Sequence, residues 1–200
     1  MHLQTQSMSE TKRLFAAIHI KPTEAFSDIF NNLKQILGFH IIKWVDPNNI
    51  HITLKFLGET PVEEIPAIIE ALKTSTEGIQ PFDIKLANTG IFGSYYLPRV
   101  IWAGIDASDE LLKLSANVVA NLEAIGYLSD RQNFVPHLTL GRIKEIKDKA
   151  HFQEVLSHFS NFVYQTQHVT GFTLFESILK KEGPEYNVLG EFTFGENPVC

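Results

Sequence analysis

The sequence predicts an α/β fold of two lobes that share one continuous body, and three observations lead to this prediction. Apolar runs typical of strands alternate with segments that carry helix start and stop signals. The spelling His-x-Thr-Leu occurs once in each half of the chain, at residues 51–54 and 137–140, which indicates a duplicated half and a pseudo-twofold. No Gly/Ser-rich linker separates the halves. We therefore expect residues 1–11 to be a disordered tail and residues 12–196 to be a single bilobal domain.

The first half begins with a predicted strand and a predicted helix. The apolar run 12–20 is typical of a strand, and "KPTE" after it favours a helix that continues to about Gly38. The segment 43–49 is rich in turn residues, and 51–57 alternates like a strand. That alternation puts His51, Thr53, Lys55 and Leu57 on one face of the strand, and Ile52, Leu54 and Phe56 on the other.

A helix start is predicted directly after this strand. Thr60 and Glu63 have the spacing of a capping box, and Pro61 stands at what would be the first helical position. The helix is expected to run through about Lys73, with a kink near Pro66.

The remaining elements continue the alternation of strands and helices. They are expected as strands at 81–93 and 99–105, a helix from Ser108 or Asp109 to Gly126, a strand at 137–142, a charged helix from about Asp148 to Phe159, and strands at 162–169, 171–180 and 186–194.

Composition bounds the classes to which the protein can belong. In a chain of 200 residues that is 44% hydrophobic, the single cysteine, Cys200, rules out a disulfide framework and a cysteine-rich metal site, which fits a reducing cytoplasm. No apolar run approaches the roughly 18 residues of a membrane span, and the first twelve residues lack the apolar core of a signal peptide. A net charge of −6 argues against a broad nucleic-acid-binding surface but allows a local phosphate pocket. We expect a cytoplasmic protein without a membrane partner.

The paired motif is the strongest functional signal. A lone histidine on a half-buried strand is most often a hydrogen-bonded structural residue. Two copies of the full spelling are expected by chance in only about 10⁻⁴ to 10⁻³ of such chains. Residues i and i+2 of a strand face the same way, about 6.5 Å apart, so each motif presents one imidazole and one hydroxyl to the same space. The pair therefore predicts a site made of His51, Thr53, His137 and Thr139.

This set of side chains suits phosphodiester chemistry without a metal. A neutral imidazole can take a proton from an attacking water while an imidazolium gives one to a departing ribose oxygen. Threonine hydroxyls can donate hydrogen bonds to the charged phosphate oxygens. Since the ordinary histidine pKa is about 6.5, one partner can be protonated and the other neutral near neutral pH, and the rate should be bell-shaped in pH.

Two cations near the motifs are further candidates. Arg142 ends the second motif and could grip a phosphate with two hydrogen bonds. Strand parity puts it on the opposite face from His137, so this role needs a bulge or a strand end, which Gly141 could permit. Lys55 shares the His51 face by parity and could add positive charge. The alternative for both cations is a solvated position at a strand end.

Four segments together resemble the two-histidine (2H) phosphoesterases. They are "RLFAAI" at 13–18, "NIHITLKFLGE" at 49–59, "RVIWAGI" at 99–105 and "FVPHLTLGR" at 134–142. Within that superfamily the chain is most similar to the LigT/ThpR-type proteins, described as RNA 2′,3′-cyclic phosphodiesterases and historically as 2′-5′ RNA ligases. The resemblance extends from about Lys12 to Phe194.

The resemblance implies a two-lobed fold with antiparallel-rich sheets, outer helices and a central cleft. It also implies that no metal or organic cofactor is used and that RNA or oligonucleotide 2′,3′-cyclic phosphate ends are hydrolysed to 2′-phosphomonoesters, with 2′-5′ ligation as an activity in vitro. We expect the protein to act as a monomer. By position the resemblance assigns His51 as the acid that protonates the leaving oxygen, His137 as the base that activates water, Thr53, Thr139 and Arg142 as phosphate ligands, and Phe15 as an aromatic that stacks on a nucleobase.

Two alternatives stay open at this point. The same chemistry could act on a small cyclic nucleotide or on a 2′-5′ linkage. A non-catalytic module could instead bind a nucleotide or RNA end without turnover. Tyr95 and Tyr96, in the loop between two strands, are further candidates for base contact.

Overall fold

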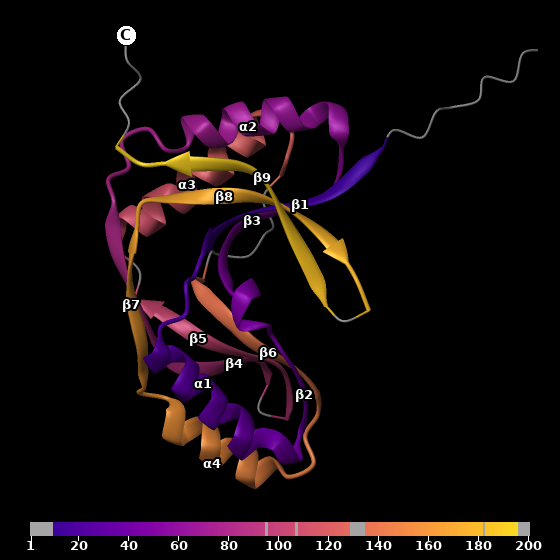
Figure 1. Cartoon of the computed structure of the whole chain (residues 1–200), viewed down its shortest axis with the longest axis vertical. Helices are drawn as coiled ribbons and strands as arrows, with labels where there is room; N and C mark the ends of the chain where they lie inside the picture. Colours follow the sequence, from indigo (N-terminus) through magenta and orange to yellow (C-terminus); the bar gives the residue numbers. More distant parts are fainter. Residues whose placement is uncertain (1–9, 95, 107, 129–134, 182, 196–200) are drawn as a thin grey trace, which may run out of the picture.

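The computed structural model describes residues 10–94, 96–106, 108–128, 135–181 and 183–195, and it arranges them in two antiparallel sheets (Figure 1). The strand order is β3-β1-β8-β9 in the first sheet and β2-β6-β5-β4-β7 in the second. The strands are Thr11–His19 (β1), Ile41–Trp44 (β2), His51–Pro61 (β3), Phe82–Ser94 (β4), Leu97–Asp106 (β5), His137–Glu145 (β6), Val163–Val169 (β7), Gly171–Leu179 (β8) and Pro184–Thr193 (β9). Each sheet thus contains one His-x-Thr strand, as the predicted two-lobed α/β fold requires.

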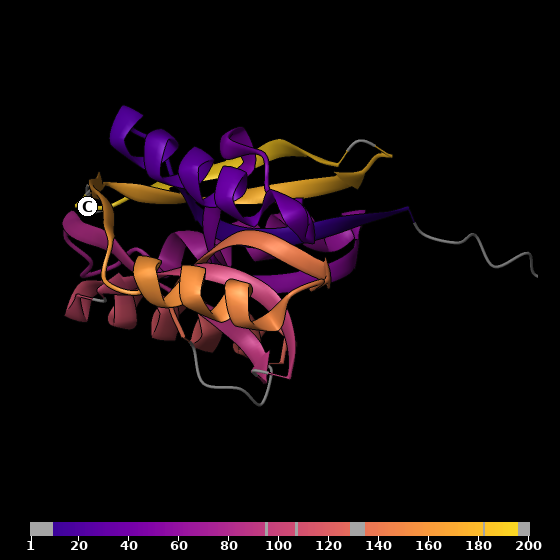
Figure 2. The same ribbon diagram turned by 90° about the horizontal axis from the view of Figure 1, so that it is seen from below.

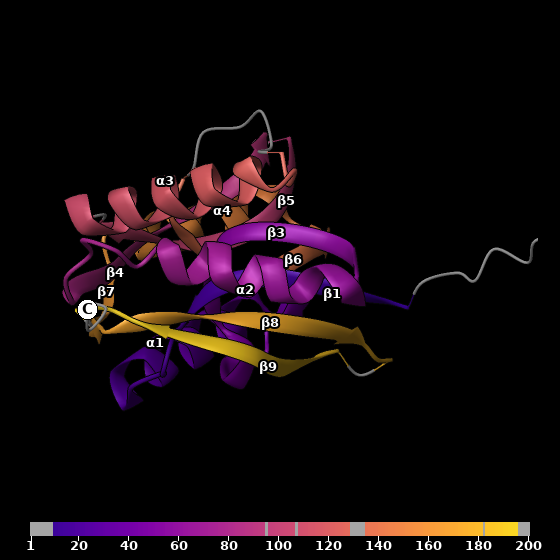
Figure 3. The same ribbon diagram turned by 90° about the horizontal axis from the view of Figure 1, so that it is seen from above.

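Four α-helices lie on the outer sides of the two sheets in the described chain. They are Glu24–Ile36 (α1), Ile65–Thr74 (α2), Asp109–Ala124 (α3) and Lys149–Phe159 (α4), with short 3₁₀ turns at Leu37–Phe39, Pro47–Asn49 and Val62–Glu64. Figure 2 shows α1 and α4 side by side, and they contact β7 and β4 of the second sheet. Figure 3 shows α2 beside α3, and these helices contact β9 and β3 of the first sheet. The faces of the sheets away from the helices are left for the site.

Three helix starts follow the local signals in the sequence. The side chains of Thr23, Ser108 and Asp148 each accept a hydrogen bond from a backbone N–H in the first turn of α1, α3 and α4. Such caps satisfy donors that have no partner within the helix. The predicted helix starts at these three places are confirmed.

The predicted capping box at Thr60 is wrong. Strand β3 continues through Pro61, and Thr60 is a fully buried strand residue paired with Lys12. Helix α2 begins only at Ile65, so Pro66 lies in its first turn, where proline is tolerated and does not kink the helix. Pairing with β1 extends the strand past the cap signal, because the cross-strand hydrogen bonds outweigh a local preference.

The turn predicted at 43–49 is also partly wrong. Its first residues belong to β2, a short edge strand that pairs with β6, and only Pro47–Asn49 form a tight turn. Short edge strands have little periodicity of their own, so only the neighbouring strand reveals them. This correction places Lys43 directly opposite Arg142.

One apolar cluster runs through both lobes. It joins buried side chains of β1 and β3 with those of β4, β5 and β6 and with all four helices. Of the predicted tail, residues 1–9 lie outside the described chain, whereas Thr11 already begins β1. In the part of the chain that the structure describes, none of the helices is long and apolar enough to cross a membrane.

Candidate active site

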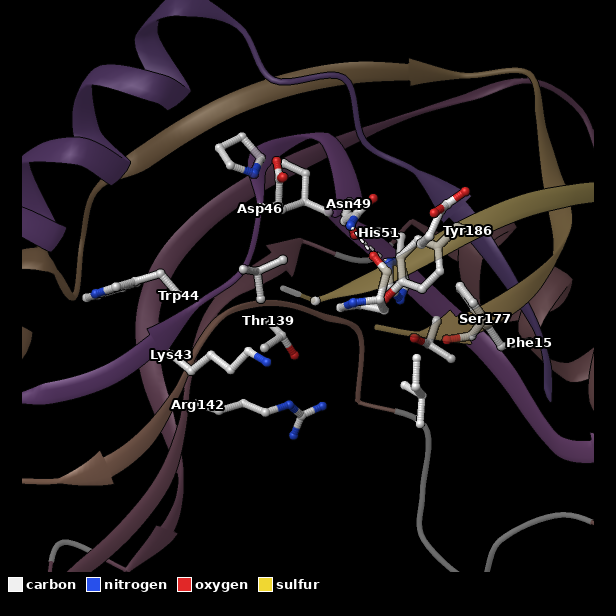
Figure 4. Close-up of a pocket in the computed structure, with 18 of the residues that line it drawn as sticks. Phe15, Lys43, Trp44, Asp46, Asn49, His51, Thr139, Arg142, Ser177 and Tyr186 are labelled. Atoms are coloured by element: carbon white, nitrogen blue, oxygen red, sulfur yellow. Dashed lines mark hydrogen bonds between the residues drawn. The ribbon is translucent and has the colours of Figure 1, made fainter. Parts of the chain in front are cut away.

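The two His-x-Thr strands meet where the two sheets adjoin. Strands β3 and β6 contact each other, and a cleft of about 1010 Å³ opens between the lobes at this place (Figure 4). The sequence-predicted site residues all line it: His51 and Thr53 from β3, His137, Thr139 and Arg142 from β6, and Phe15 from β1. The two halves of the predicted site therefore converge on one space.

Both motif histidines are held in the same way. His51 Nδ1 lies 2.8 Å from the backbone oxygen of Asn49, and His137 Nδ1 lies 2.8 Å from the backbone oxygen of Val135. Since a carbonyl can only accept, Nδ1 carries the hydrogen and donates it. The Nε2 atom of each ring is then the one that can take or give a proton. The two imidazoles thus present equivalent nitrogen atoms for proton transfer.

Aromatic side chains surround the His51 ring. The Phe15 and Tyr186 ring centres lie 4.8 and 5.4 Å from the His51 ring centre. Phe15 is only 3% exposed and also stacks on Phe175, at 5.3 Å. Little of the Phe15 ring is left open to a nucleobase, and its contacts are those of a side chain that supports the imidazole. Asn49 adds to this support because its side-chain amide donates to the Pro184 carbonyl on β9.

Burial lowers the pKa of His51 from its ordinary value of 6.5. The hydrogen bond to the Asn49 carbonyl opposes this shift, while the charges of His19 and His137 add to it. Desolvation disfavours the charged form of a histidine, so the neutral imidazole is favoured in the free protein. A bound anion next to the ring would act in the opposite direction.

A bulge returns Arg142 to the face of His137. Thr139 pairs with Trp102 and Gly141 pairs with Ile101, so Leu140 is an extra residue between them. One extra residue reverses the alternation of all side chains after it. A Cβ at Gly141 would lie 2.8 Å from an Ile42 methyl carbon, which explains why the bulge carries glycine. The bulge that Arg142 needs in order to share the face of His137 is therefore present.

The first motif strand has a bulge at the matching position, and here the predicted faces are wrong. Leu54 is an extra residue between the pairs that Thr53 and Lys55 make with β1. Lys55 therefore points away from His51; it is 8% exposed, and its Nζ donates to the Leu128 carbonyl at 2.6 Å. Phe56, expected in the core, is 43% exposed and lines the cleft. Phe56 thus occupies in β3 the position that Arg142 occupies in β6.

Several residues that line the cleft were not identified from the sequence, and two of them adjoin predicted site residues. The sequence predicts a turn at Lys43, but β2 presents this residue to the cleft beside Arg142. Tyr186 is far from both motifs in sequence and reaches His51 from β9. Neither carries a local sequence signal. Tyr95 lies outside the described residues, and Tyr96, which is 84% exposed, does not line the cleft.

Comparison with known proteins identifies a family whose match includes both motif strands. The family described as "LigT like Phosphoesterase" matches residues 18–102 and 105–186, a span that includes both motifs. The chain belongs to the LigT-like phosphoesterase family. Among curated relatives, a protein of Archaeoglobus fulgidus named RNA 2′,3′-cyclic phosphodiesterase is 35% identical over 90% of this chain and 99% of its own length. One of the same name from Aquifex aeolicus is 31% identical over 86% of this chain and 93% of its own length.

Solved structures agree on the LigT-like fold. A protein of Thermus thermophilus has a TM-score of 0.75 at 30% identity and covers 91% of this chain and 97% of its own. LigT of E. coli in its apo form has a TM-score of 0.73 at 25% identity and covers 94% of this chain and 100% of its own. The two-lobed fold predicted from the sequence is therefore that of the LigT-like phosphoesterases.

Proposed function

We propose that the protein hydrolyses the 2′,3′-cyclic phosphate end of RNA or an oligonucleotide to a 2′-phosphomonoester, without a metal ion or organic cofactor. The observation that carries this proposal is the pair of imidazoles that reach one cleft from two sheets, each with Nδ1 bound to a backbone carbonyl and Nε2 left for proton transfer. The names of the curated relatives support the choice of reaction. Both motifs come from one chain, so we propose that the enzyme acts as a monomer. We also propose that it acts in the cytoplasm, because a single cysteine fits a reducing compartment.

The proposed reaction is an attack of water on the cyclic phosphate. His137 Nε2 takes a proton from the water, whose oxygen forms a bond to phosphorus, and the bond from phosphorus to the ribose 3′ oxygen breaks. His51 Nε2–H gives its proton to that departing oxygen, which leaves the phosphate on the 2′ oxygen. Thr53, Thr139 and Arg142 donate hydrogen bonds to the non-bridging oxygens, where negative charge grows in the transition state.

The acid role of His51 requires its imidazolium form. Burial lowers the pKa of His51 in the free protein, so the substrate itself has to favour protonation. A phosphodiester carries a negative charge, and an opposite charge within hydrogen-bond range raises the pKa of a histidine. The alternative is that His51 is the base and His137 the acid. Stacking of a nucleobase on Phe15 stays a prediction; the small exposed fraction of that ring favours a supporting role instead.

The test is the product formed from an oligonucleotide with a 2′,3′-cyclic phosphate end in the presence of a chelator. We expect ring opening that the chelator does not slow, and a product that co-elutes with a 2′-phosphate standard. A 3′-phosphate product would contradict the proposed direction of cleavage. Loss of activity that an added divalent ion restores would contradict the metal-free mechanism, and tight binding without product would favour the binding-module alternative.

A further inference from the structure

The cleft is positively charged although the chain is acidic. The net charge of the sequence is −6, yet five cations and two carboxylates line the cleft: Arg13, Lys34, Lys43, Arg142 and Lys180, with Asp46 and Glu185. Lys180 is paired with Glu185. Within the described residues, neither Lys43 nor Arg142 has a carboxylate in ion-pair range. A cleft that concentrates unpaired cations in this way is suited to an anion.

Lys43 and Arg142 stand directly opposite each other on neighbouring strands. They form a register pair between β2 and β6, and Figure 4 shows both side chains extending toward Thr139. Like charges in such a pair are destabilising, because the side chains start only about 4.5–5.5 Å apart at Cβ. The repulsion is relieved when negative charge lies between or beside them.

The phosphate that reacts does not need Lys43. In the proposed mechanism, its two non-bridging oxygens accept hydrogen bonds from Thr53, Thr139 and the two-pronged guanidinium of Arg142. These four donors already give each of the two oxygens two hydrogen bonds, so the reacting phosphate does not depend on a further ammonium. Lys43 is therefore not needed at the reacting phosphate and is available to bind a second phosphate group.

The cations continue beyond Lys43 toward α1. Lys34, in the last turn of α1, lines the same cleft, with its Nζ 5.4 Å from the centre of the Phe30 ring. That ring in turn meets Trp44 of β2 edge-on, at 5.6 Å. Arg142 on β6, Lys43 on β2 and Lys34 on α1 thus form a series that leads away from the histidines. The cleft volume of about 1010 Å³ lies at the upper end of the range for small-ligand pockets, which leaves room for more than one nucleotide.

We propose that Lys43 binds the phosphate on the 5′ side of the terminal nucleotide and that Lys34 binds the phosphate before it. This inference rests on the proposed function and adds the residues that make the enzyme prefer an oligonucleotide to a nucleoside cyclic phosphate. The opposite route out of the cleft passes Arg13, whose guanidinium lies over the Phe56 ring, 4.7 Å from the ring centre. Lys34 has a looser contact of the same kind, at 5.4 Å from the Phe30 ring centre, so Arg13 is the competing candidate that the experiment has to test. Lys43 and Lys34 are favoured because they follow Arg142 along one side of the cleft, from β6 to β2 to α1.

The test uses three substrates that differ in the number of nucleotides and therefore of phosphates: a nucleoside 2′,3′-cyclic phosphate, and a dinucleotide and a trinucleotide that end in the same group. We expect Lys43→Gln to lower kcat/KM about tenfold on the dinucleotide and trinucleotide, mainly through KM, and to affect the nucleoside far less. Lys34→Gln should lower kcat/KM only on the trinucleotide. Because one phosphate contact is lost, the dependence of log kcat/KM on log salt should become shallower by about one in each case.

Matched variants separate this inference from its alternatives. Lys149→Gln removes one charge from α4, outside the cleft, and should leave all three rates close to wild type. An equal loss on all three substrates with Lys43→Gln would assign Lys43 to the reacting phosphate and overturn the inference. If Arg13→Gln lowers kcat/KM more on longer substrates and Lys43→Gln does not, the inference is also overturned. The RNA would then leave the cleft past Arg13. If wild type hydrolyses none of the three, the proposed function fails as well.

Discussion

Replacing either motif histidine by alanine is expected to lower kcat by about 10²–10⁴-fold, because each removes one of the two proton carriers. The two variants should differ in how their residual rates depend on pH. In His137→Ala only the proposed acid, His51, remains, so the rate should fall as pH rises. In His51→Ala only the proposed base, His137, remains, so the rate should rise with pH.

The pH at which the residual rate of His137→Ala declines depends on the pKa of His51, which its surroundings determine. Burial lowers the pKa of His51 below 6.5 in the free protein, and kcat/KM reports the free protein. In His137→Ala, kcat/KM should therefore already decline with rising pH below 6.5, whereas kcat, which reports the complex, should decline at higher pH. The measurement is the residual rate of both variants from about pH 5 to pH 9, corrected for attack by hydroxide.

A histidine next to the site serves as the control. His19 is the register partner of His51 on β1, but its ring bonds to the Asn48 carbonyl and does not line the cleft. His19→Ala should keep kcat within a few-fold of wild type. If the residual rate of His137→Ala rises with pH and that of His51→Ala falls, the acid and base roles are exchanged. Wild-type rates in both variants would exclude the histidine mechanism.

Arg142→Ala is expected to lower kcat/KM by roughly 10–100-fold, since it removes charged hydrogen bonds of about 1.5–3 kcal/mol to the reacting phosphate. Arg142→Lys should recover only part of this loss, because an ammonium keeps the charge but not the two-pronged geometry. The loss should be the same on a nucleoside cyclic phosphate and on an oligonucleotide. The measurement is steady-state kinetics on both substrates.

The control for this prediction is another arginine of the same sheet. Arg99 on β5 is exposed and does not line the cleft, so Arg99→Ala should leave kcat/KM near the wild-type value. A full recovery by Arg142→Lys would show that charge alone is sufficient. A loss of kcat/KM on the oligonucleotide alone would indicate that Arg142 contacts another phosphate of the RNA and not the reacting one.

Much of the fold and of the candidate site was accessible to sequence reasoning because the signals are local. The caps at Thr23, Ser108 and Asp148 act within one helical turn, so they mark three helix starts correctly. The i, i+2 spacing puts each histidine and its threonine on one face of a strand wherever the strand lies. The two motifs thus predicted the residues that meet in the cleft, although nothing local says how far apart they fold.

The errors have a common physical cause. Thr60 carried a cap signal that pairing with β1 overrode, and β2 was hidden because a short edge strand depends on its neighbour. The faces of Lys55 and Phe56 were wrong because a bulge is defined only against a partner strand, which one chain segment cannot reveal.

The sequence by itself determined the two-lobed α/β fold and the chemistry available to it: two imidazoles, two hydroxyls and one guanidinium in a fixed order along the chain. Only the tertiary structure decided that Arg142 and Phe56 face the cleft and Lys55 does not, and that Lys43 stands beside Arg142. The reason is that residue type and alternation are properties of a segment, whereas register, bulges and desolvation arise between segments.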